Sequence, residues 1–239
     1  MTEELAPRDA YLRECSAVVT AVTDGGVVLD RTVFYPRGGG QPGDIGMLAW
    51  DGGAATVLDT VREQGEVLHV VIPGQAPPVG TAVRAAVDWE RRHLLMRTHT
   101  ALHVLSALVW REYGAKVTGG NMEPGQARMD FELEAMSVEF GREVEERLNA
   151  MLSAPHVVQV AFLPRVEALA DPDLIRTKVS LIPEHVDPIR VVDIAGLDRQ
   201  ADGGTHVANT TEVGWVRVVK TESKGKGNKR MRIELDAPA

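Results

Sequence analysis

Short apolar runs alternate with glycine, proline and aspartate over residues 12–88. These runs occupy positions 17–22, 27–29, 55–58, 67–72 and 82–87. Apolar segments of this length, separated by turn-forming residues, are typical of β-strands joined by tight turns. The pattern predicts an all-β unit, either a small barrel or a sandwich.

A helical pattern replaces this alternation at Asp88. Asp88 can cap a helix over residues 89–113, a stretch rich in leucine, arginine, alanine and histidine that stops at Gly114. A second predicted helix begins at Ser137 and ends before Pro155. Its apolar positions follow one another at spacings of four, four and three residues: Phe140, Val144, Leu148 and Met151.

The remainder of the chain mixes strands and helices. A short helix is expected near residues 166–175, and strands are expected at 157–162, 189–194, 213–221 and 229–235. This order lacks a regular βαβ alternation, which favours an α+β domain with a mostly antiparallel sheet. We therefore predict an α+β protein with a β-barrel-like domain at 1–90 and an α+β domain at 91–239, divided near residues 88–92.

The composition is that of a globular protein. Of 239 residues, 44% are hydrophobic and 25% are charged. A single cysteine, Cys15, excludes an internal disulfide and fits a reducing cytosol. The first residues lack a secretory signal pattern, and no apolar run approaches the roughly 20 residues of a membrane span. We expect a soluble, cytoplasmic protein.

Positive charge is concentrated near the end of this acidic chain. Residues 217–232 carry a local balance of +6, which leaves −14 for the remainder of a chain whose net charge is −8. Glu222 is the one acidic residue among seven basic ones: Arg217, Lys220, Lys224, Lys226, Lys229, Arg230 and Arg232. Such a segment can bind a polyanion such as nucleic acid, or it can be a solvated hairpin turn.

Two pairs of residues are spaced as metal ligands. His99 and His103 lie four apart, so both imidazoles project from one face of the predicted helix. The metalloprotease motif needs glutamate at position 100, where this chain has Thr100. Asp202 and His206, in DGGTHV, can complete a four-ligand site or can be a turn residue and a strand-start residue. The other histidines are expected to be exposed or hydrogen-bonded residues of the fold: His69, His93, His156 and His185.

A glycine-rich segment, RTVFYPRGGGQPGD, occupies residues 31–44. The glycines at 38–40 can bring backbone amides close to an anionic backbone, and Arg37 and Gln41 can donate hydrogen bonds. A β-turn containing the Pro-Gly pair at 42–43 is the alternative. The segment is not a P-loop, because no GK[ST] sequence follows.

Five segments taken together resemble the editing domains of alanyl-tRNA synthetases and their free-standing relatives, the AlaX trans-editing proteins. The resemblance covers nearly the whole chain and is closest to the medium-length AlaX form. It lies in FYPRGGGQPGD at 34–44, VDWERRHLLMRTHTALHVL at 87–105, RMDFEL at 128–133, GGTHVANTTEVG at 203–214 and SKGKGNKRMRI at 223–233.

The resemblance implies a metal-dependent hydrolase that deacylates tRNA(Ala) carrying serine or glycine. It implies a β-barrel-like domain followed by an α+β editing domain shared with threonyl-tRNA synthetases. His99, His103 and His206 match the family's zinc ligands, whereas Asp202 stands where the family has cysteine. A carboxylate is a harder ligand than a thiolate, so another divalent ion can replace Zn²⁺. Asp202 either ligates the ion or orients a ligand histidine.

The same resemblance assigns further residues. Thr32 matches a threonine implicated in recognising the serine hydroxyl, and Gln41 is expected to line the same cleft, between the two domains. The residues expected to contact the tRNA acceptor stem are Arg37, Lys220, Lys224, Lys226, Lys229 and Arg230. The residues themselves leave three alternatives open: a non-catalytic RNA-binding module with a structural metal, a metal-dependent hydrolase of another aminoacyl ester, and an iron enzyme.

Overall fold

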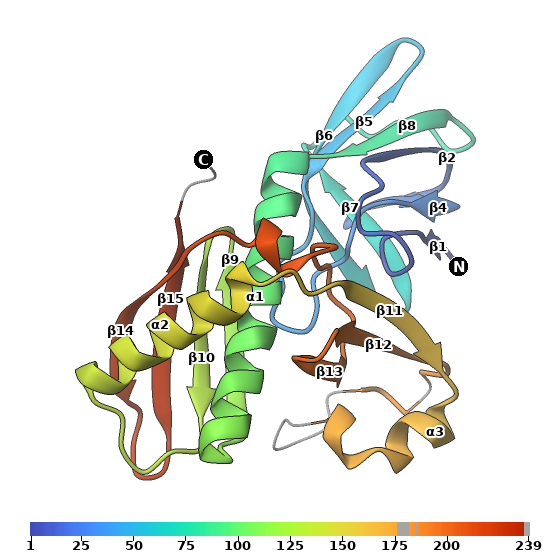
Figure 1. The fold of residues 1–239 in the computed structure, drawn as a ribbon. Coiled ribbons are helices and arrows are strands. Elements are labelled where there is room, and N and C mark those ends of the chain that lie inside the picture. Colours follow the sequence, from blue (N-terminus) through green and yellow to red (C-terminus); the bar gives the residue numbers. More distant parts are fainter. Residues whose placement is uncertain (176–181, 185, 237–239) are drawn as a thin grey trace. The chain divides into compact units, whose positions relative to one another are not determined.

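A computed structural model describes residues 1–175, 182–184 and 186–236, so His185 lies outside the described part (Figure 1). The chain forms two compact units, Met1–His93 and Leu94–Ala239. The division falls inside helix α1 (Trp89–Tyr113), close to the boundary at 90/91 expected from the sequence.

The first unit is a closed six-stranded barrel. Its strands follow one another around the barrel in the order β2-β3-β7-β6-β5-β8, and every neighbouring pair is antiparallel. Their bounds are β2 (Glu14–Thr23), β3 (Gly26–Leu29), β5 (Gly46–Trp50), β6 (Gly53–Glu63), β7 (Glu66–Val71) and β8 (Ala82–Val87). Buried positions alternate with exposed ones along β6 and β8, as strands with one face in a core require. The predicted all-β unit is therefore confirmed, as a barrel.

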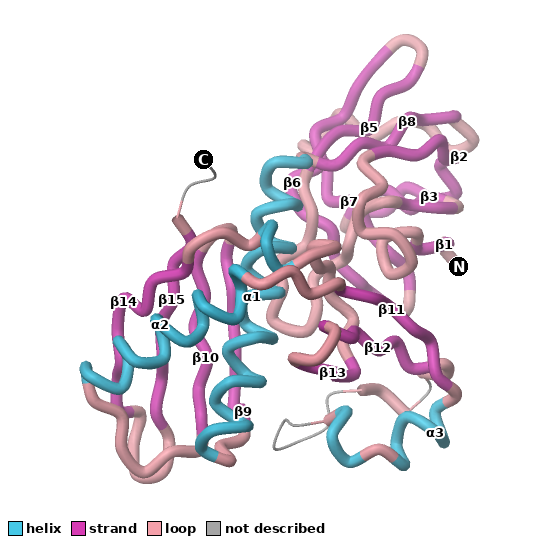
Figure 2. Tube along the Cα trace, in the orientation of Figure 1, coloured by secondary structure: helices cyan, strands magenta, loops and turns pink. Residues whose placement is uncertain are grey.

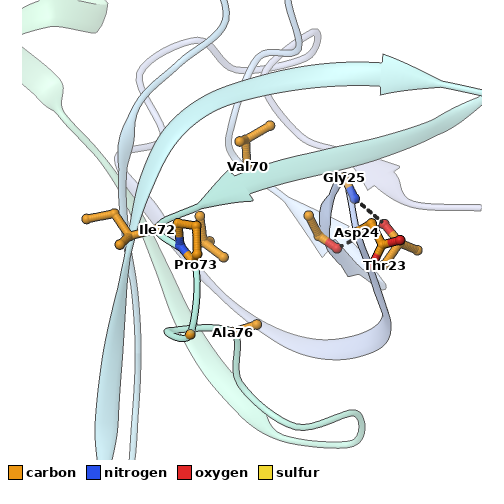
Figure 3. A pocket seen from close by; sticks show the side chains of 10 residues that line it. Thr23, Asp24, Gly25, Val70, Ile72, Pro73 and Ala76 are labelled. Atoms are coloured by element: carbon orange, nitrogen blue, oxygen red, sulfur yellow. Dashed lines mark hydrogen bonds between the residues drawn. The ribbon is translucent and has the colours of Figure 1, made fainter.

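Short segments complete the barrel unit. Strand β1 (Glu3–Glu4) pairs in parallel with β4 (Arg31–Thr32). A pocket of about 290 Å³ lies between the turn after β2 and the end of β7 (Figure 3). Among its ten lining residues Asp24 is the one charged side chain, and Thr23 accepts a hydrogen bond from the Gly25 amide. This pocket therefore lacks a cluster of reactive groups.

The second unit contains two antiparallel sheets together with helices (Figure 2). The larger sheet has the order β14-β15-β10-β9, and the smaller has the order β11-β12-β13. Their strands are β9 (Val117–Glu123), β10 (Gln126–Phe131), β11 (Val158–Leu163), β12 (Ile189–Ile194), β13 (Asp198–Ala201), β14 (Val216–Ser223) and β15 (Lys229–Leu235). The helices are α2 (Val138–Ser153) and α3 (Arg165–Ala170), with 3₁₀ turns η1 (Pro172–Leu174) and η2 (Thr210–Glu212). The predicted α+β class is confirmed.

The two long helices begin and end where their capping residues predict. The Asp88 carboxylate accepts the Arg91 amide at 3.1 Å, and α1 stops before Gly114, whose φ of +61° is left-handed. Ser137 caps α2 by accepting the Phe140 amide at 3.0 Å. Across the described residues, every helix falls short of the length or the apolarity that crossing a membrane requires.

Candidate metal centre

Helix α1 brings two buried histidines to one of its faces. His99 and His103 are one helical turn apart, and their ring centroids lie 5.2 Å from each other. Their exposed fractions are 6% and 8%. A buried imidazole is costly unless its nitrogens find partners, so this pair requires polar groups from elsewhere in the unit.

Those groups come from the segment that follows β13. The Asp202 carboxylate accepts the Gly204 amide at 2.7 Å, which forms an Asx-type turn. The turn directs the chain back, so that Nε2 of His206 lies 3.1 Å from the same carboxylate oxygen. The turn and the ligand interpretations of Asp202 are therefore compatible, because one carboxylate serves both.

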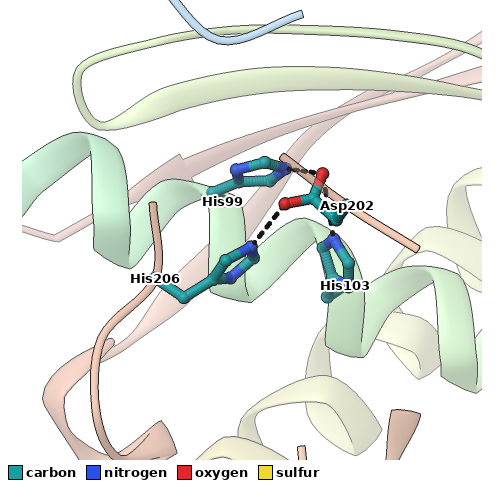
Figure 4. A group of neighbouring side chains, drawn as sticks. All are labelled: His99, His103, Asp202 and His206. Atoms are coloured by element: carbon teal, nitrogen blue, oxygen red, sulfur yellow. Dashed lines mark hydrogen bonds and ion pairs between the residues drawn. The ribbon is translucent and has the colours of Figure 1, made fainter. Parts of the chain in front are cut away.

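The four side chains converge on a common point (Figure 4). Their potential ligand atoms all lie within 4.8 Å of one another. Oδ1 of Asp202 is 3.5 Å from Nε2 of His99 and 3.9 Å from Nε2 of His103. Ligands at about 2.0–2.2 Å from a tetrahedral ion are roughly 3.3–3.6 Å apart. Three imidazoles and one carboxylate gathered this closely could hold a metal ion.

Neighbouring groups orient two of the imidazoles. Nδ1 of His103 lies 2.9 Å from Oδ2 of Asp198. The same oxygen accepts a hydrogen bond from the side-chain amide of Gln200 at 2.7 Å. Nδ1 of His206 lies 3.1 Å from the Thr100 hydroxyl. Hydrogen bonds at Nδ1 fix the ring and direct Nε2 toward the common point, as partners of metal-binding histidines do.

The electrostatics also prepare the cluster for a cation. Burial lowers the pKa of His99 to about 4 and holds the pKa of His206 well below its usual value. Burial also opposes charge on His103, but hydrogen bonds to Asp198 and Asp202 outweigh it and raise its pKa to about 9. A metal ion at Nε2 of His103 would take the place of that proton. Although burial opposes ionisation of Asp202, the neighbouring histidines, His99 foremost, hold its pKa well below the usual range.

Thr32 lies in the barrel unit and has no exposed surface. Its hydroxyl is 2.8 Å from Nε2 of His69 and accepts the Phe34 amide at 3.1 Å. His69 is also fully buried, and its Nδ1 bonds the Val27 carbonyl at 3.0 Å. His69 is thus a hydrogen-bonded histidine of the fold, one of the two roles expected from the sequence. Its partner is Thr32, the residue that the family resemblance assigns to recognition of the serine hydroxyl.

The glycine-rich segment forms a tight turn. Gly38 and Gln41 exchange two backbone hydrogen bonds of 3.1 and 2.9 Å across the two intervening glycines, which have φ values of +59° and +84°. The alternative of a turn is therefore right, but it is centred on residues 39–40 and not on the Pro-Gly pair. The backbone amides of Gly38 and Gln41 each donate to the carbonyl oxygen of the other residue, so neither amide is directed at an anion. Gln41 is buried, and Arg37 is paired with Asp59.

The basic segment is the hairpin of β14 and β15, and much of its charge is compensated. Four of its cations pair with carboxylates: Arg217 with Asp236, Lys220 and Arg232 with Glu222, and Arg230 with Asp130. Lys229 is buried, and its Nζ donates to the Gly225 carbonyl. Within the part of the chain that the structure describes, Lys224 and Lys226 are the exposed cations of this segment outside ion pairs.

Comparison with known proteins agrees with both units. The model of class II tRNA synthetases (A) matches residues 10–91, and that of the threonyl and alanyl tRNA synthetase second additional domain matches residues 189–232. The chain is 39% identical to the alanyl-tRNA editing protein AlaX-M of Saccharolobus solfataricus, over 97% of this chain and 98% of that protein. The chain belongs to the AlaX-M family. The family resemblance inferred from five sequence segments is thereby confirmed.

Other AlaX-M proteins and longer ligases are also similar. The AlaX-M protein of Methanosarcina acetivorans is 38% identical over 98% of this chain and 99% of its own length. The alanine–tRNA ligase of Pyrobaculum arsenaticum is 39% identical over 95% of this chain, which corresponds to 26% of that ligase. The AlaX-M chain thus corresponds to about a quarter of the ligase.

The groups that surround the four candidate ligands of this AlaX-M chain were not predicted from its sequence. Asp198 stands four residues before Asp202, and Asp202 stands four residues before His206. This repeated spacing could have indicated that Asp198 lies near the other two residues. Arg190 had no comparable signal. The pairing of β12 with β13 brings its side chain to the Asp202 backbone carbonyl at 2.8 Å, and its Nη1 lies 3.7 Å from Oδ2 of that residue.

Proposed function

We propose that the protein hydrolyses the ester of serine mistakenly attached to tRNA(Ala), using a divalent ion held by His99, His103, Asp202 and His206. The observation that carries this proposal is the convergence of these four donors in a chain of the AlaX-M family. Alanyl-tRNA editing proteins of this family are deacylases, so the chain is a carboxylic ester hydrolase.

The donor set suits Zn²⁺ with Asp202 as a direct ligand. Oδ1 of Asp202 faces His99 and His103, whereas Oδ2 accepts the Gly204 amide. A bound divalent ion would supply Lewis acidity, either lowering the pKa of a water molecule or anchoring the amino acid. Because the fourth donor is oxygen and not sulfur, the site should also accept Co²⁺ or Mn²⁺.

The protein's own residues position the reacting ester. An aminoacyl ester is already labile, so orientation of the ester and activation of a water molecule are sufficient, and a covalent nucleophile is unnecessary. Burial raises the pKa of the Cys15 thiol, which does not suit a nucleophile. Asp198 and Thr100 hold the imidazoles of His103 and His206 in fixed orientations.

Selectivity is assigned to Thr32, with Gln41 in a supporting role. A buried hydroxyl that bonds the serine side chain is left without that partner when alanine binds, which disfavours correctly charged tRNA. Thr32 has no exposed surface, so its contact with a substrate hydroxyl would require a neighbouring side chain to move. Gln41 is similarly buried, with 1% exposed.

The tRNA acceptor stem is the proposed partner of Arg37 and of the hairpin around Lys224 and Lys226. Phosphate contacts position a nucleic acid, and base contacts specify it. Lys224 and Lys226 are best placed for such contacts because both are exposed at the hairpin turn. Lys220 and Arg230 would first have to exchange their carboxylate partners for phosphate.

Deacylation of Ser-, Gly- and Ala-tRNA(Ala) with and without a chelator tests this function. We expect Ser-tRNA(Ala) to be hydrolysed fastest, and chelation or His103→Ala to slow that reaction by about a hundredfold or more. His156→Ala is a matched control, since His156 lies in the same unit outside the cluster and bonds the Ala195 carbonyl. Full activity of metal-stripped protein would refute the metal role. Binding of tRNA without deacylation would favour the non-catalytic module.

A further inference from the structure

His69 forms a hydrogen bond at each of its ring nitrogens inside the barrel. It lies on β7, opposite Val27 of β3, and has no exposed surface. Nδ1 is 3.0 Å from the Val27 carbonyl oxygen, and Nε2 is 2.8 Å from the Thr32 hydroxyl. The Phe34 ring packs edge-on against the imidazole, with centroids 5.1 Å apart. The imidazole is therefore held in one orientation.

These contacts determine where the protons lie. A carbonyl oxygen only accepts, so Nδ1 of His69 carries the proton that bonds Val27. The buried ring is neutral, with its pKa lowered to about 4, so Nε2 is an acceptor. The Thr32 hydroxyl must then donate to Nε2, while its oxygen accepts the Phe34 amide.

The Thr32 hydroxyl has one proton and two acceptor positions. Its proton is directed to His69, and one acceptor position is directed to Phe34. Among the described residues, its second acceptor position has no partner. The group that Thr32 can still bind is therefore a hydrogen-bond donor.

We propose that His69 is a positioning residue for substrate selectivity, which fixes the Thr32 hydroxyl as an acceptor for a donor group on the amino acid. This inference rests on the proposed function, in which Thr32 distinguishes serine from alanine. The serine side chain offers an O–H donor, and the alanine methyl group offers none. Without His69, the Thr32 proton can rotate into the position that the serine proton needs.

Two conservative variants separate the two hydrogen bonds of His69. In His69→Gln the terminal amide falls near the Nε2 position, where its oxygen can accept the Thr32 proton. In His69→Asn the amide falls near the Nδ1 position, so it can bond Val27 but cannot reach Thr32. Each variant loses one hydrogen bond and some ring volume, so similar losses of stability are expected for the two.

The measurement is kcat/KM for Ser-tRNA(Ala) relative to Ala-tRNA(Ala), with thermal unfolding as a control for folding. We expect His69→Asn to lower this ratio about tenfold or more, and His69→Gln to stay within about threefold of wild type. Thr32→Val should lower the ratio at least as much as His69→Asn.

The other outcomes would overturn different parts of the argument. Equal losses of selectivity in the two His69 variants would show a merely structural role and overturn the positioning role. Wild-type ratios in both, with a lowered ratio in Thr32→Val, would overturn the role of His69 but leave that of Thr32. An unchanged ratio in Thr32→Val would overturn both assignments. Absence of Ser-tRNA(Ala) hydrolysis by the wild type would refute the proposed function itself.

Discussion

Three of the four side chains of the candidate metal centre are held by a further polar group. Asp202 is held by the Gly204 amide, His103 by Asp198 and His206 by Thr100. These contacts remove rotational freedom before an ion binds, so less entropy is lost on binding. Asp198 is itself held in place, because one of its oxygens accepts hydrogen bonds from both His103 and the Gln200 side chain.

Replacing Asp198 should weaken metal binding without altering the ligands themselves. We expect Asp198→Ala to lower the affinity for Zn²⁺ by about 10- to 100-fold, the usual effect of losing a partner of a metal-binding histidine. Asp198→Asn should lie between this variant and wild type, since the amide oxygen still accepts from His103 but carries no charge. Competition with a chromogenic chelator measures the affinity, and circular dichroism controls for folding. Wild-type affinity in Asp198→Ala would contradict the role of this carboxylate.

Among the elements, the hairpin of β14 and β15 illustrates why a run of like charges in sequence overestimates free charge. Asp130 is distant from Arg230 in the chain but lies opposite it across β10 and β15. Asp236 similarly neutralises Arg217. Such partners become visible only once strand pairing is known. The charge available for a nucleic acid is therefore concentrated at Lys224 and Lys226.

Reversing these two charges should weaken tRNA binding and its dependence on salt. For Lys224→Glu with Lys226→Glu, we expect affinity to fall by about tenfold or more, and the slope of log K against log salt to decrease by about 2. The control is Lys116→Glu with Arg142→Glu, which changes the net charge equally at exposed positions outside the hairpin. Filter binding at several salt concentrations measures both quantities. Equal effects of the two double variants would mean that net charge, and not this hairpin, governs binding.

A helix or strand could be predicted where its own residues carry a recognisable pattern, and not where only pairing with a neighbouring strand defines it. Helices α1 and α2 were predicted because a capping residue and a terminating residue flank each apolar pattern. Strands β12 and β15 were predicted at the bounds observed. Strands β9 and β13 were missed, since VTGGNME lacks an apolar alternation and DRQA has only four residues, so each is a strand only because a neighbour pairs with it. Strand β10 was not predicted as a strand either, although residues 128–131 of it belong to a segment that carries the family resemblance.

At the scale of the whole molecule, the candidate residues fall in two units. The barrel unit contains Thr32, Gln41 and Arg37, and the second unit contains the metal centre and the basic hairpin. The four side chains of the candidate metal centre were predictable as a group because spacing identified them as two pairs. The supporting groups were not, because tertiary contacts select them. The same holds for His69 in the barrel unit, because the residues around it in the sequence do not indicate that Thr32 is its hydrogen-bond partner.

The buried His69 should make the stability of the whole protein depend on pH. Its pKa is about 4 in the folded protein and about 6.5 when unfolded, so between these values the unfolded chain binds a proton that the folded chain does not. Stability is therefore lost as the pH falls. Between pH 7 and pH 5 we expect His69 to contribute a loss of about 2 kcal/mol, which is absent in His69→Gln. Urea unfolding of wild type and His69→Gln at pH 7 and pH 5 measures these free energies. If the two proteins differ in free energy of unfolding by the same amount at both pH values, the predicted role of His69 is contradicted.

The carboxylate of Asp202 also has a consequence for oxidative chemistry. A thiolate ligand is readily converted to sulfenic acid or a disulfide, and the metal is then lost. In this protein the four donors are nitrogen and oxygen, and the single thiol, Cys15, lies on β2 of the other unit with its pKa raised by burial. The candidate metal centre therefore offers peroxide no sulfur to attack, so the proposed editing activity should withstand oxidative stress that inactivates a cysteine-ligated site.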